Sequence, residues 1–342
     1  MQSKLLSIWN MVLLSLAVGG GLVGCGGGGV VAVVDPCPPL AAAVPAAAGA
    51  SAPVSATGAY LCAAGVGVSN LEASVAFYKK AFAMKERARI VRSDRHEVVL
   101  DSADDRGSRL VLMQFTDGVV RNVRQNPGKI VFYVKDLAVL ESVRTAFVAA
   151  GLDKPRAPVS SLGSNISFGR DPDGNLVEIA TSSTAVHAYL SAIGIGVSNL
   201  TQAKAFYVDT LDMVPDARIK LSASLPAGYI PVPVQPALAA SGAEPAQAAI
   251  PAYNEYILLS NAGRGSAIVL MNYPSSPANY TNNPIKLTLR ANDPVAYAAR
   301  ISAAGRTVTQ APAVGAEYGT LGNTVVGAAR DADGTVLELL GP

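Results

Sequence analysis

The stretch Gly65-Val66-Gly67-Val68-Ser69-Asn70-Leu71, followed by Phe77-Tyr78, decides the fold, because it returns almost unchanged later in the chain. The second copy reads Gly194-Ile195-Gly196-Val197-Ser198-Asn199-Leu200, followed by Phe206-Tyr207. In each copy, small and β-branched residues predict a strand, and a serine or asparagine predicts the N-cap of the next helix. Each region closes on a similar turn and glutamate, at 171–178 and at 331–338. The chain is therefore a tandem duplication.

Composition narrows the class of protein. Hydrophobic residues make up 50% of the 342 residues and charged residues 15%, and the net charge is +2. This balance is typical of a globular protein and argues against a nucleic-acid partner, which would favour a basic face. Only two histidines are present, so little room is left for the commonest metal and acid–base chemistry.

Residues 1–24 predict an export signal, because Lys4 precedes the apolar run 5–18 and a glycine-rich segment. The residues Leu22-Val23-Gly24-Cys25 resemble the lipobox of bacterial lipoproteins, which implies cleavage before Cys25 and lipidation of its thiol. Gly26 then implies, by the same resemblance, an anchor in the bacterial cell envelope, at the outer membrane and facing the periplasm. An uncleaved membrane anchor and an ordinary signal peptide are the alternatives.

Residues 25–59 predict a lipidated cysteine followed by a flexible tether, because this segment is rich in Gly, Ala and Pro and almost free of charge. Cys37 and Cys62 remain after the signal and the lipidated cysteine are set aside. They are either disulfide partners in an oxidising compartment or two unrelated thiols.

The duplication predicts a first domain over 60–182, a hinge at 183–188 and a second domain over 189–342. Within each domain a strand, a helix and three strands occur twice, so each repeat contains two βαβββ units. Tyr78 and Tyr207 are 129 positions apart, whereas Glu97 and Glu255 are 158 apart. The second domain therefore carries an inserted loop at 222–253, which is either mobile or a functional lid.

The opening pattern and the Asp-Pro-Asp-Gly-x-x-x-Glu ending together resemble the vicinal oxygen chelate superfamily, which includes glyoxalases, bleomycin-resistance proteins and extradiol dioxygenases. The resemblance covers both repeats. It implies an α+β fold of two tandem glyoxalase-like domains, in each of which two βαβββ units form a curved, mostly antiparallel sheet cup. In metal-dependent members it implies a divalent ion inside the cup, which polarises the substrate as a Lewis acid.

Carrying the family's four metal-ligand positions onto this sequence leaves one metal-binding side chain in each repeat. The positions fall on Ala63, Leu112, Lys129 and Glu178, and on Ala192, Leu270, Lys286 and Glu338. Because a catalytic zinc site usually has three protein ligands, neither a metal nor another cofactor is predicted. We expect Lys129 to face Glu178, and Lys286 to face Glu338, inside a cup. Each pair is either a cationic head for an anionic or carbonyl ligand, a structural ion pair, or two strand ends in solvent.

Other residues complete the predicted cups. Gln114 and Asn272 follow the second ligand position and are candidates for hydrogen bonds to a ligand at the rim, or are ordinary strand residues. An apolar lining suits a partly hydrophobic ligand, and it would come from Met113, Phe115, Met271 and Tyr273. His96 and His187 are predicted to be surface or half-buried residues without a catalytic partner.

These observations favour an exported, lipid-anchored, glyoxalase-like protein that binds a small molecule without metal-dependent catalysis. The predicted ligand-binding residues are Lys129, Glu178, Gln114, Lys286, Glu338 and Asn272. Two alternatives stay open. One is a metal-dependent lyase, isomerase or dioxygenase with a site assembled differently, and the other is an envelope interaction module that uses the insert as a contact arm.

Overall fold

We describe the fold from a computed structural model. The described residues are 58–119, 121, 128–161, 163–216, 254–273, 285–314 and 324–341. The signal segment, Cys25, the tether up to residue 57 and the insert 222–253 lie outside these ranges. Within them, no helix combines the length and the apolar character needed to cross a membrane.

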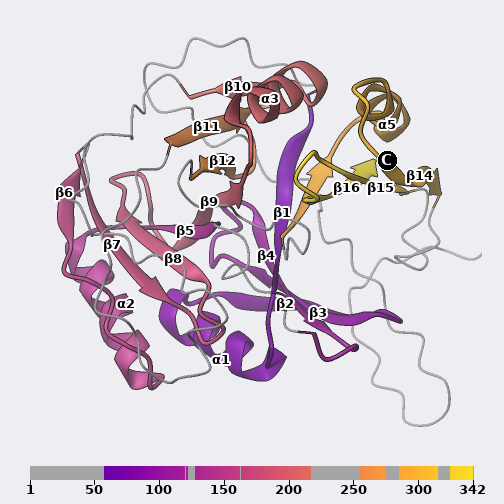
Figure 1. The fold of residues 1–342 in the computed structure, drawn as a ribbon. Helices are drawn as coiled ribbons and strands as arrows, with labels where there is room; N and C mark the ends of the chain where they lie inside the picture. The colour runs from indigo at the N-terminus through magenta and orange to yellow at the C-terminus, as the bar shows by residue number, and fades with distance from the viewer. Residues whose placement is uncertain are drawn as a thin grey trace, which may run out of the picture. The chain divides into compact units, whose positions relative to one another are not determined.

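Four βαβββ units follow one another along the chain (Figure 1). The first consists of β1 (Tyr60–Gly67), α1 (Leu71–Phe82), β2 (Lys85–Val91), β3 (Arg95–Asp101) and β4 (Arg109–Phe115). The second consists of β5 (Lys129–Val134), α2 (Leu137–Ala149), β6 (Val159–Ser161), β7 (Ser164–Arg170) and β8 (Leu176–Thr181). The third consists of β9 (Tyr189–Gly196), α3 (Leu200–Ala205), the π-helical turn η1 (Phe206–Thr210), β10 (Met213–Pro215), β11 (Asn254–Ser260) and β12 (Ala267–Asn272). The fourth consists of β13 (Lys286–Arg290), α5 (Pro294–Ala303), β14 (Val308–Val314), β15 (Val325–Arg330) and β16 (Val336–Gly341).

The described strands form two eight-stranded sheets. Sheet A has the order β14-β15-β16-β13-β1-β4-β3-β2, and sheet B has the order β10-β11-β12-β9-β5-β8-β7-β6. In every unit the first strand lies parallel to the fourth strand, as β1 does to β4, whereas all other neighbours are antiparallel. The predicted α+β class with two glyoxalase-like, mostly antiparallel sheets is confirmed.

Each sheet combines one unit from each repeat, which differs from our expectation that the two units of one repeat close one cup. Strands β1 and β13 join the first and fourth units, with Gly65 opposite Lys286. Strands β5 and β9 join the second and third units, with Lys129 opposite Gly194. The connection between β8 and β9, residues 182–188, is short. The third unit therefore begins next to the second and pairs with it, and the first and fourth units pair with each other.

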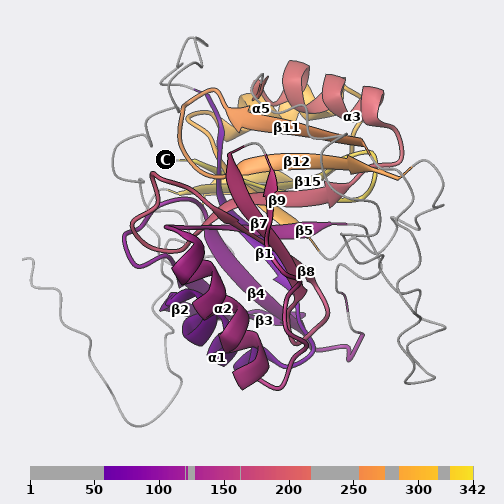
Figure 2. The same ribbon diagram turned by 90° about the vertical axis from the view of Figure 1, so that its left-hand side faces the viewer.

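The units of one repeat are held together through their helices. In the first repeat α1 lies beside α2 (Figure 2), and the rings of Phe77 on α1 and Phe147 on α2 meet edge to face with their centroids 4.8 Å apart. The hydroxyl of Tyr78, from the opening motif, donates a hydrogen bond to Asp171 at 2.8 Å. Asp173 accepts a hydrogen bond from the backbone N–H of Ser69 at 2.6 Å. The opening motif and the closing turn of each repeat are thus direct structural partners.

The second repeat reproduces these contacts. The hydroxyl of Tyr207 donates to Asp331 at 2.9 Å, and the backbone N–H of Ser198 donates to Asp333 at 3.1 Å. Of the two cap candidates in each motif, the asparagine is the N-cap, since Asn70 accepts a hydrogen bond from the N–H of Ala73 at 3.1 Å. The side-chain oxygen therefore satisfies an N–H group that the first turn of α1 leaves without a helical partner.

The two sheets meet at a pair of equivalent serines. The backbone N–H of Ser108 donates to the hydroxyl of Ser266 at 2.7 Å, and the backbone N–H of Ser266 donates to the hydroxyl of Ser108 at 2.8 Å. Gly107 precedes this contact with φ +71°, and a Cβ there would lie 2.2 Å from the carbonyl oxygen of Leu190. The Arg-Gly-Ser sequences that directly precede β4 and β12 therefore mark where the two sheets approach each other closely.

Candidate functional site

A buried lysine lies between two glutamates in each cup. In sheet B the Nζ atom of Lys129 lies 2.7 Å from Glu178 Oε2 and 2.7 Å from Glu255 Oε1. In sheet A the Nζ atom of Lys286 lies 3.0 Å from Glu97 Oε1 and 3.6 Å from Glu338 Oε2. The structure thus brings together both predicted lysine–glutamate pairs and places them away from bulk solvent.

Sequence reasoning missed the second glutamate of each cluster. Glu97 lies on β3 and Glu255 on β11, the third strands of the first and third units. Their side chains are 1% exposed, and carboxylates this buried require a cationic or hydrogen-bonding partner. The sequence signal that could have identified these residues is the presence of a glutamate at the equivalent position of a duplicated strand.

The first glycine of the opening motif makes room for the lysine. Gly194 lies opposite Lys129 in the sheet, and a Cβ at this position would lie 2.7 Å from the Cγ atom of Lys129. At Gly65 a Cβ would lie 3.1 Å from the Cβ atom of Lys286. The lysine stem therefore passes over a strand that carries no side chain at that point, which allows the ammonium to reach the glutamate of the other unit.

The leucines assigned to the second ligand position, Leu112 and Leu270, do not face the cups, which corrects this assignment; the methionines that follow them do. These two leucines belong to the core on the helix side of the sheets. Met113 and Met271 belong to the separate apolar clusters on the cup faces. Successive side chains of a strand point to opposite faces, so an assignment that is one residue off selects the wrong face.

This donor set does not fit a divalent metal ion. The positions in sheet A are Ala63, Met113, Lys286 and Glu338, and in sheet B they are Ala192, Met271, Lys129 and Glu178. Each set offers one carboxylate and one thioether, and an ammonium ion lies where a ligand would be needed. Within the described residues, no three His, Cys, Asp or Glu side chains are grouped in a way that could hold a metal.

In the sheet A cup, arginines balance the carboxylates. Arg92 Nε lies 3.5 Å from Glu97 Oε1 and its Nη2 lies 3.7 Å from Glu338 Oε1. Arg95 Nε lies 2.6 Å from Glu97 Oε1. Burial raises the pKa of Glu97, but Lys286, Arg92 and Arg95 outweigh this effect and lower the pKa from 4.5 to about 2. Both carboxylates of this cup are therefore matched by cations.

In the sheet B cup, the ammonium group of Lys129 forms ion pairs with two carboxylates. Lys129 is the only cation of the described part of the chain within ion-pair distance of Glu178 or Glu255. Burial raises the pKa of Glu255, and the neighbouring charge of Glu178 adds to this increase, although Lys129 partly offsets it. The Oε2 atom of Glu255 is buried and has no hydrogen-bond partner among the described residues. Equivalent glutamates of the duplicated units thus have opposite pKa shifts.

Comparisons with known proteins agree with this architecture. The family model of the Glyoxalase/Bleomycin resistance protein/Dioxygenase superfamily matches residues 61–179. The first repeat of this chain is thus similar to the domains of that superfamily. Among solved structures it is similar to glyoxalase I from Zea mays, with a TM-score of 0.59 and 17% identity over 83% of this chain and 92% of that one. A putative dioxygenase from Bacillus subtilis gives a TM-score of 0.55 and 11% identity over 82% and 84% of the two chains. A search of curated proteins finds no match.

The two predicted rim amides lie on the helix side of the sheets. The Oε1 atom of Gln114 accepts a hydrogen bond from the N–H of Leu71 at 3.2 Å, and its Nε2 atom donates to Ser69 O at 3.0 Å. Asn272 Nδ2 donates to Val197 O at 2.9 Å. Both amides hold the corner between the first strand and the helix of a unit, so we do not include them in the site.

The remaining predicted residues lie where the sequence indicated. Met113 clusters with Phe115 in the sheet A cup, and Met271 clusters with Tyr273 in the sheet B cup. His96 and His187 are exposed. The role of the lysines and glutamates in ligand binding stays a prediction.

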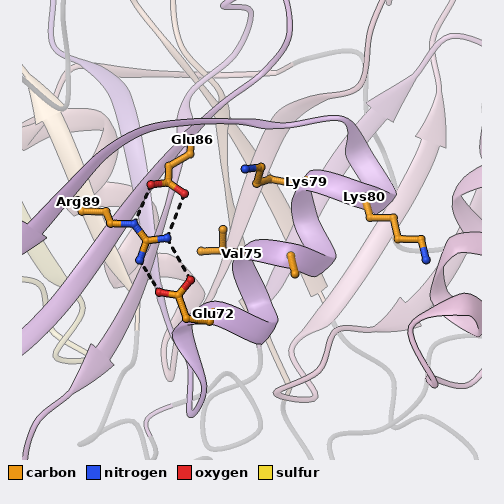
Figure 3. A pocket seen from close by; sticks show the side chains of 7 residues that line it. Glu72, Val75, Lys79, Lys80, Glu86 and Arg89 are labelled. Carbon is orange, nitrogen blue, oxygen red and sulfur yellow. Dashed lines mark hydrogen bonds and ion pairs between the residues drawn. The ribbon is translucent and has the colours of Figure 1, made fainter. Parts of the chain in front are cut away.

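A surface depression of about 510 Å³ lies on the helix side of sheet A (Figure 3). Arg89 lies between Glu72 and Glu86, with its Nε atom 2.7 Å from Glu86 Oε1. The next residue, Ile90, belongs to the cup cluster, so Arg89 points to the opposite face. Exposed ion pairs of this kind contribute little stability, and Arg89 is already matched by two carboxylates. The depression is separate from the cups.

Proposed function

We propose that this chain binds small organic molecules in its cups, with a lysine–glutamate cluster in place of a metal ion. The observation that carries the proposal is the buried ammonium between two glutamates in each cup, Lys129 in one and Lys286 in the other. Ligand sites are mostly apolar and contain a few fixed polar groups that orient the ligand. Each cup combines such a polar cluster with apolar side chains, including Met113 and Met271.

The charged clusters are not explained by stability alone. Removing charges from water costs several kcal/mol for each ion, and a buried salt bridge often stabilises a protein no better than apolar side chains of similar volume. A recognition role accounts for the presence of both charged clusters next to apolar side chains of the cup faces. A ligand that hydrogen-bonds to the cluster and packs on the methionine would use both features.

We further propose that the chain is exported and anchored to the bacterial envelope through a lipidated Cys25. The lipobox-like residues 22–25 support this proposal. Cys62 supports it independently, because it is disulfide-bonded, and structural disulfides persist mainly in oxidising compartments. Mass spectrometry of the N-terminal peptide tests the anchor. Loss of membrane association in Cys25→Ala is the expected result, and an unmodified Cys25 on the mature protein would exclude it.

A thermal-shift screen of the full-length protein against small organic anions, cations and neutral aromatic compounds tests ligand binding. We expect at least one saturable ligand whose affinity falls about tenfold or more in Lys129→Met or Lys286→Met, since charge-assisted hydrogen bonds are lost. Lys79→Met is the matched control, because Lys79 is an exposed lysine outside the cups. Failure of every compound to bind saturably, or stoichiometric divalent metal in the purified protein, would overturn the proposal.

A further inference from the structure

We propose that the sheet B cup binds a small organic cation, such as an ammonium or amidinium group carried on an apolar body. This inference rests on the proposed ligand-binding function and specifies the chemistry of one of the two cups. It follows from a difference between two clusters that the duplication would otherwise make equivalent.

The first step is the charge balance. In sheet A, Lys286 and Arg92 match Glu97 and Glu338, and Arg95 adds a third cation. In sheet B, Lys129 alone contacts both Glu178 and Glu255 among the described residues. The sheet B cluster therefore carries one carboxylate charge that no described cation matches. A buried carboxylate in this state is costly unless a proton or another cation joins it.

The second step is an unused acceptor. Lys129 occupies Oε1 of Glu255, whose side chain is 1% exposed. The other oxygen, Oε2, is buried, and no group in the described part of the chain forms a hydrogen bond with it. Buried polar atoms of native proteins are nearly always paired. An incoming N–H donor would complete the coordination of this carboxylate and supply the missing positive charge at the same time.

The third step is the lining of the cup. The apolar cluster on this face includes Val131, Met271 and Tyr273, and Tyr133 packs against it. Met271 lies against the lysine stem, since a Cβ at Gly194 would touch both Met271 Sδ and Lys129 Cγ. Aromatic rings and a polarisable thioether favour an organic cation, whose apolar body packs against them while the charge faces the ring and the carboxylate.

The probe for the test is benzylammonium, with benzyl alcohol as a neutral analogue of the same shape. In full-length protein labelled with [¹³C-methyl]methionine, the Met271 signal reports on the sheet B cup and the Met113 signal reports on the sheet A cup. We expect benzylammonium to shift the Met271 signal saturably and to leave Met113 unchanged. Benzyl alcohol should have no saturable effect on either signal.

A substitution in the sheet B cup and a control outside both cups locate the cation. Glu255→Gln should weaken benzylammonium binding about tenfold or more, because a charge-assisted hydrogen bond is lost. Glu72→Gln, at an exposed glutamate outside both cups, should leave the affinity unchanged. If Glu255→Gln does not fold, as judged by its methionine spectrum, Glu178→Gln serves as the second variant and should also weaken binding.

Three results would overturn this inference. The first is the absence of a saturable Met271 shift with benzylammonium. The second is an equal response to benzyl alcohol. The third is a Met271 signal that moves only with pH, which would mean that Glu255 takes up a proton instead of a ligand. If other compounds still bind in a lysine-dependent manner, the cation inference fails while the proposed ligand-binding function stands.

Discussion

Replacing Glu97 by glutamine should destabilise the protein strongly at neutral pH. The Glu97 carboxylate lies 2.6 Å from Arg95 Nε and 3.0 Å from Lys286 Nζ. Its pKa is lowered from 4.5 to about 2 in the folded protein. That difference corresponds to about 3 kcal/mol, at about 1.36 kcal/mol for each pH unit. Because the folded-state pKa is the lower one, this stabilisation is present above about pH 4.5 and is lost as the pH falls towards 2.

Urea denaturation at pH 7 and at pH 3 measures this contribution as a free energy of unfolding. Glu97→Gln should lower that free energy by about 3 kcal/mol at pH 7 and by only about 1 kcal/mol at pH 3. Glu255→Gln is the matched control. Since burial and Glu178 raise the pKa of Glu255, its neutral replacement should cost little at pH 7. Equal losses in the two variants, or a loss at Glu97 that does not depend on pH, would refute the reasoning.

Two further predictions concern the glycines that lie opposite the buried lysines and the disulfide of Cys62. Gly194→Ala should lower the free energy of unfolding by roughly 1–3 kcal/mol, because the new methyl group would lie 2.6 Å from Met271 Sδ and 2.7 Å from Lys129 Cγ. Gly65→Ala should lower the free energy of unfolding less, since the nearest atoms to its new methyl group are 3.0 Å away. Thermal denaturation of the two variants measures the difference, and the opposite order of stability would contradict this prediction. Peptide mapping under non-reducing conditions should show Cys62 in a disulfide, with Cys37 as the expected partner if Cys25 is lipidated. Its reduction should cost about 2–5 kcal/mol of stability, and a free thiol at Cys62 would be the contrary result.

The local elements of the fold could be predicted from the sequence. The strand predicted in each opening motif is present as β1 and β9, and the helix after each motif begins directly beyond its asparagine cap. These elements are specified by hydrophobic periodicity and capping residues, which are local signals. The approach of Lys129 to Glu178 was also predictable, because both residues lie on motifs that the resemblance places in one cup.

The pairing of the units could not be predicted in the same way. The first strands of the two repeats, β1 and β9, have nearly the same sequence. Their residue patterns therefore fit β5 and β13 equally well as pairing partners. The choice depends on chain connection and on contacts such as Ser108 with Ser266, which are distant in sequence. The assignment to Leu112 instead of Met113 failed for a related reason. A shift of one residue reverses the face of a strand, and both side chains are apolar.

Both cups contain a glutamate on the third strand of a unit. They differ in the segment that directly precedes this strand. Arg92 lies in the turn between β2 and β3, where its N–H donates to Arg95 O at 2.8 Å. From this turn both arginines reach Glu97. In the third unit the corresponding strand, β10, is short, and the chain runs through residues 217–253 before it reaches β11 and Glu255. The duplication has therefore kept the lysine and both glutamates in each cup, while the segment before the third strand has diverged. That segment supplies the two arginines that contact Glu97 in sheet A, whereas among the described residues Lys129 alone contacts the glutamates of sheet B.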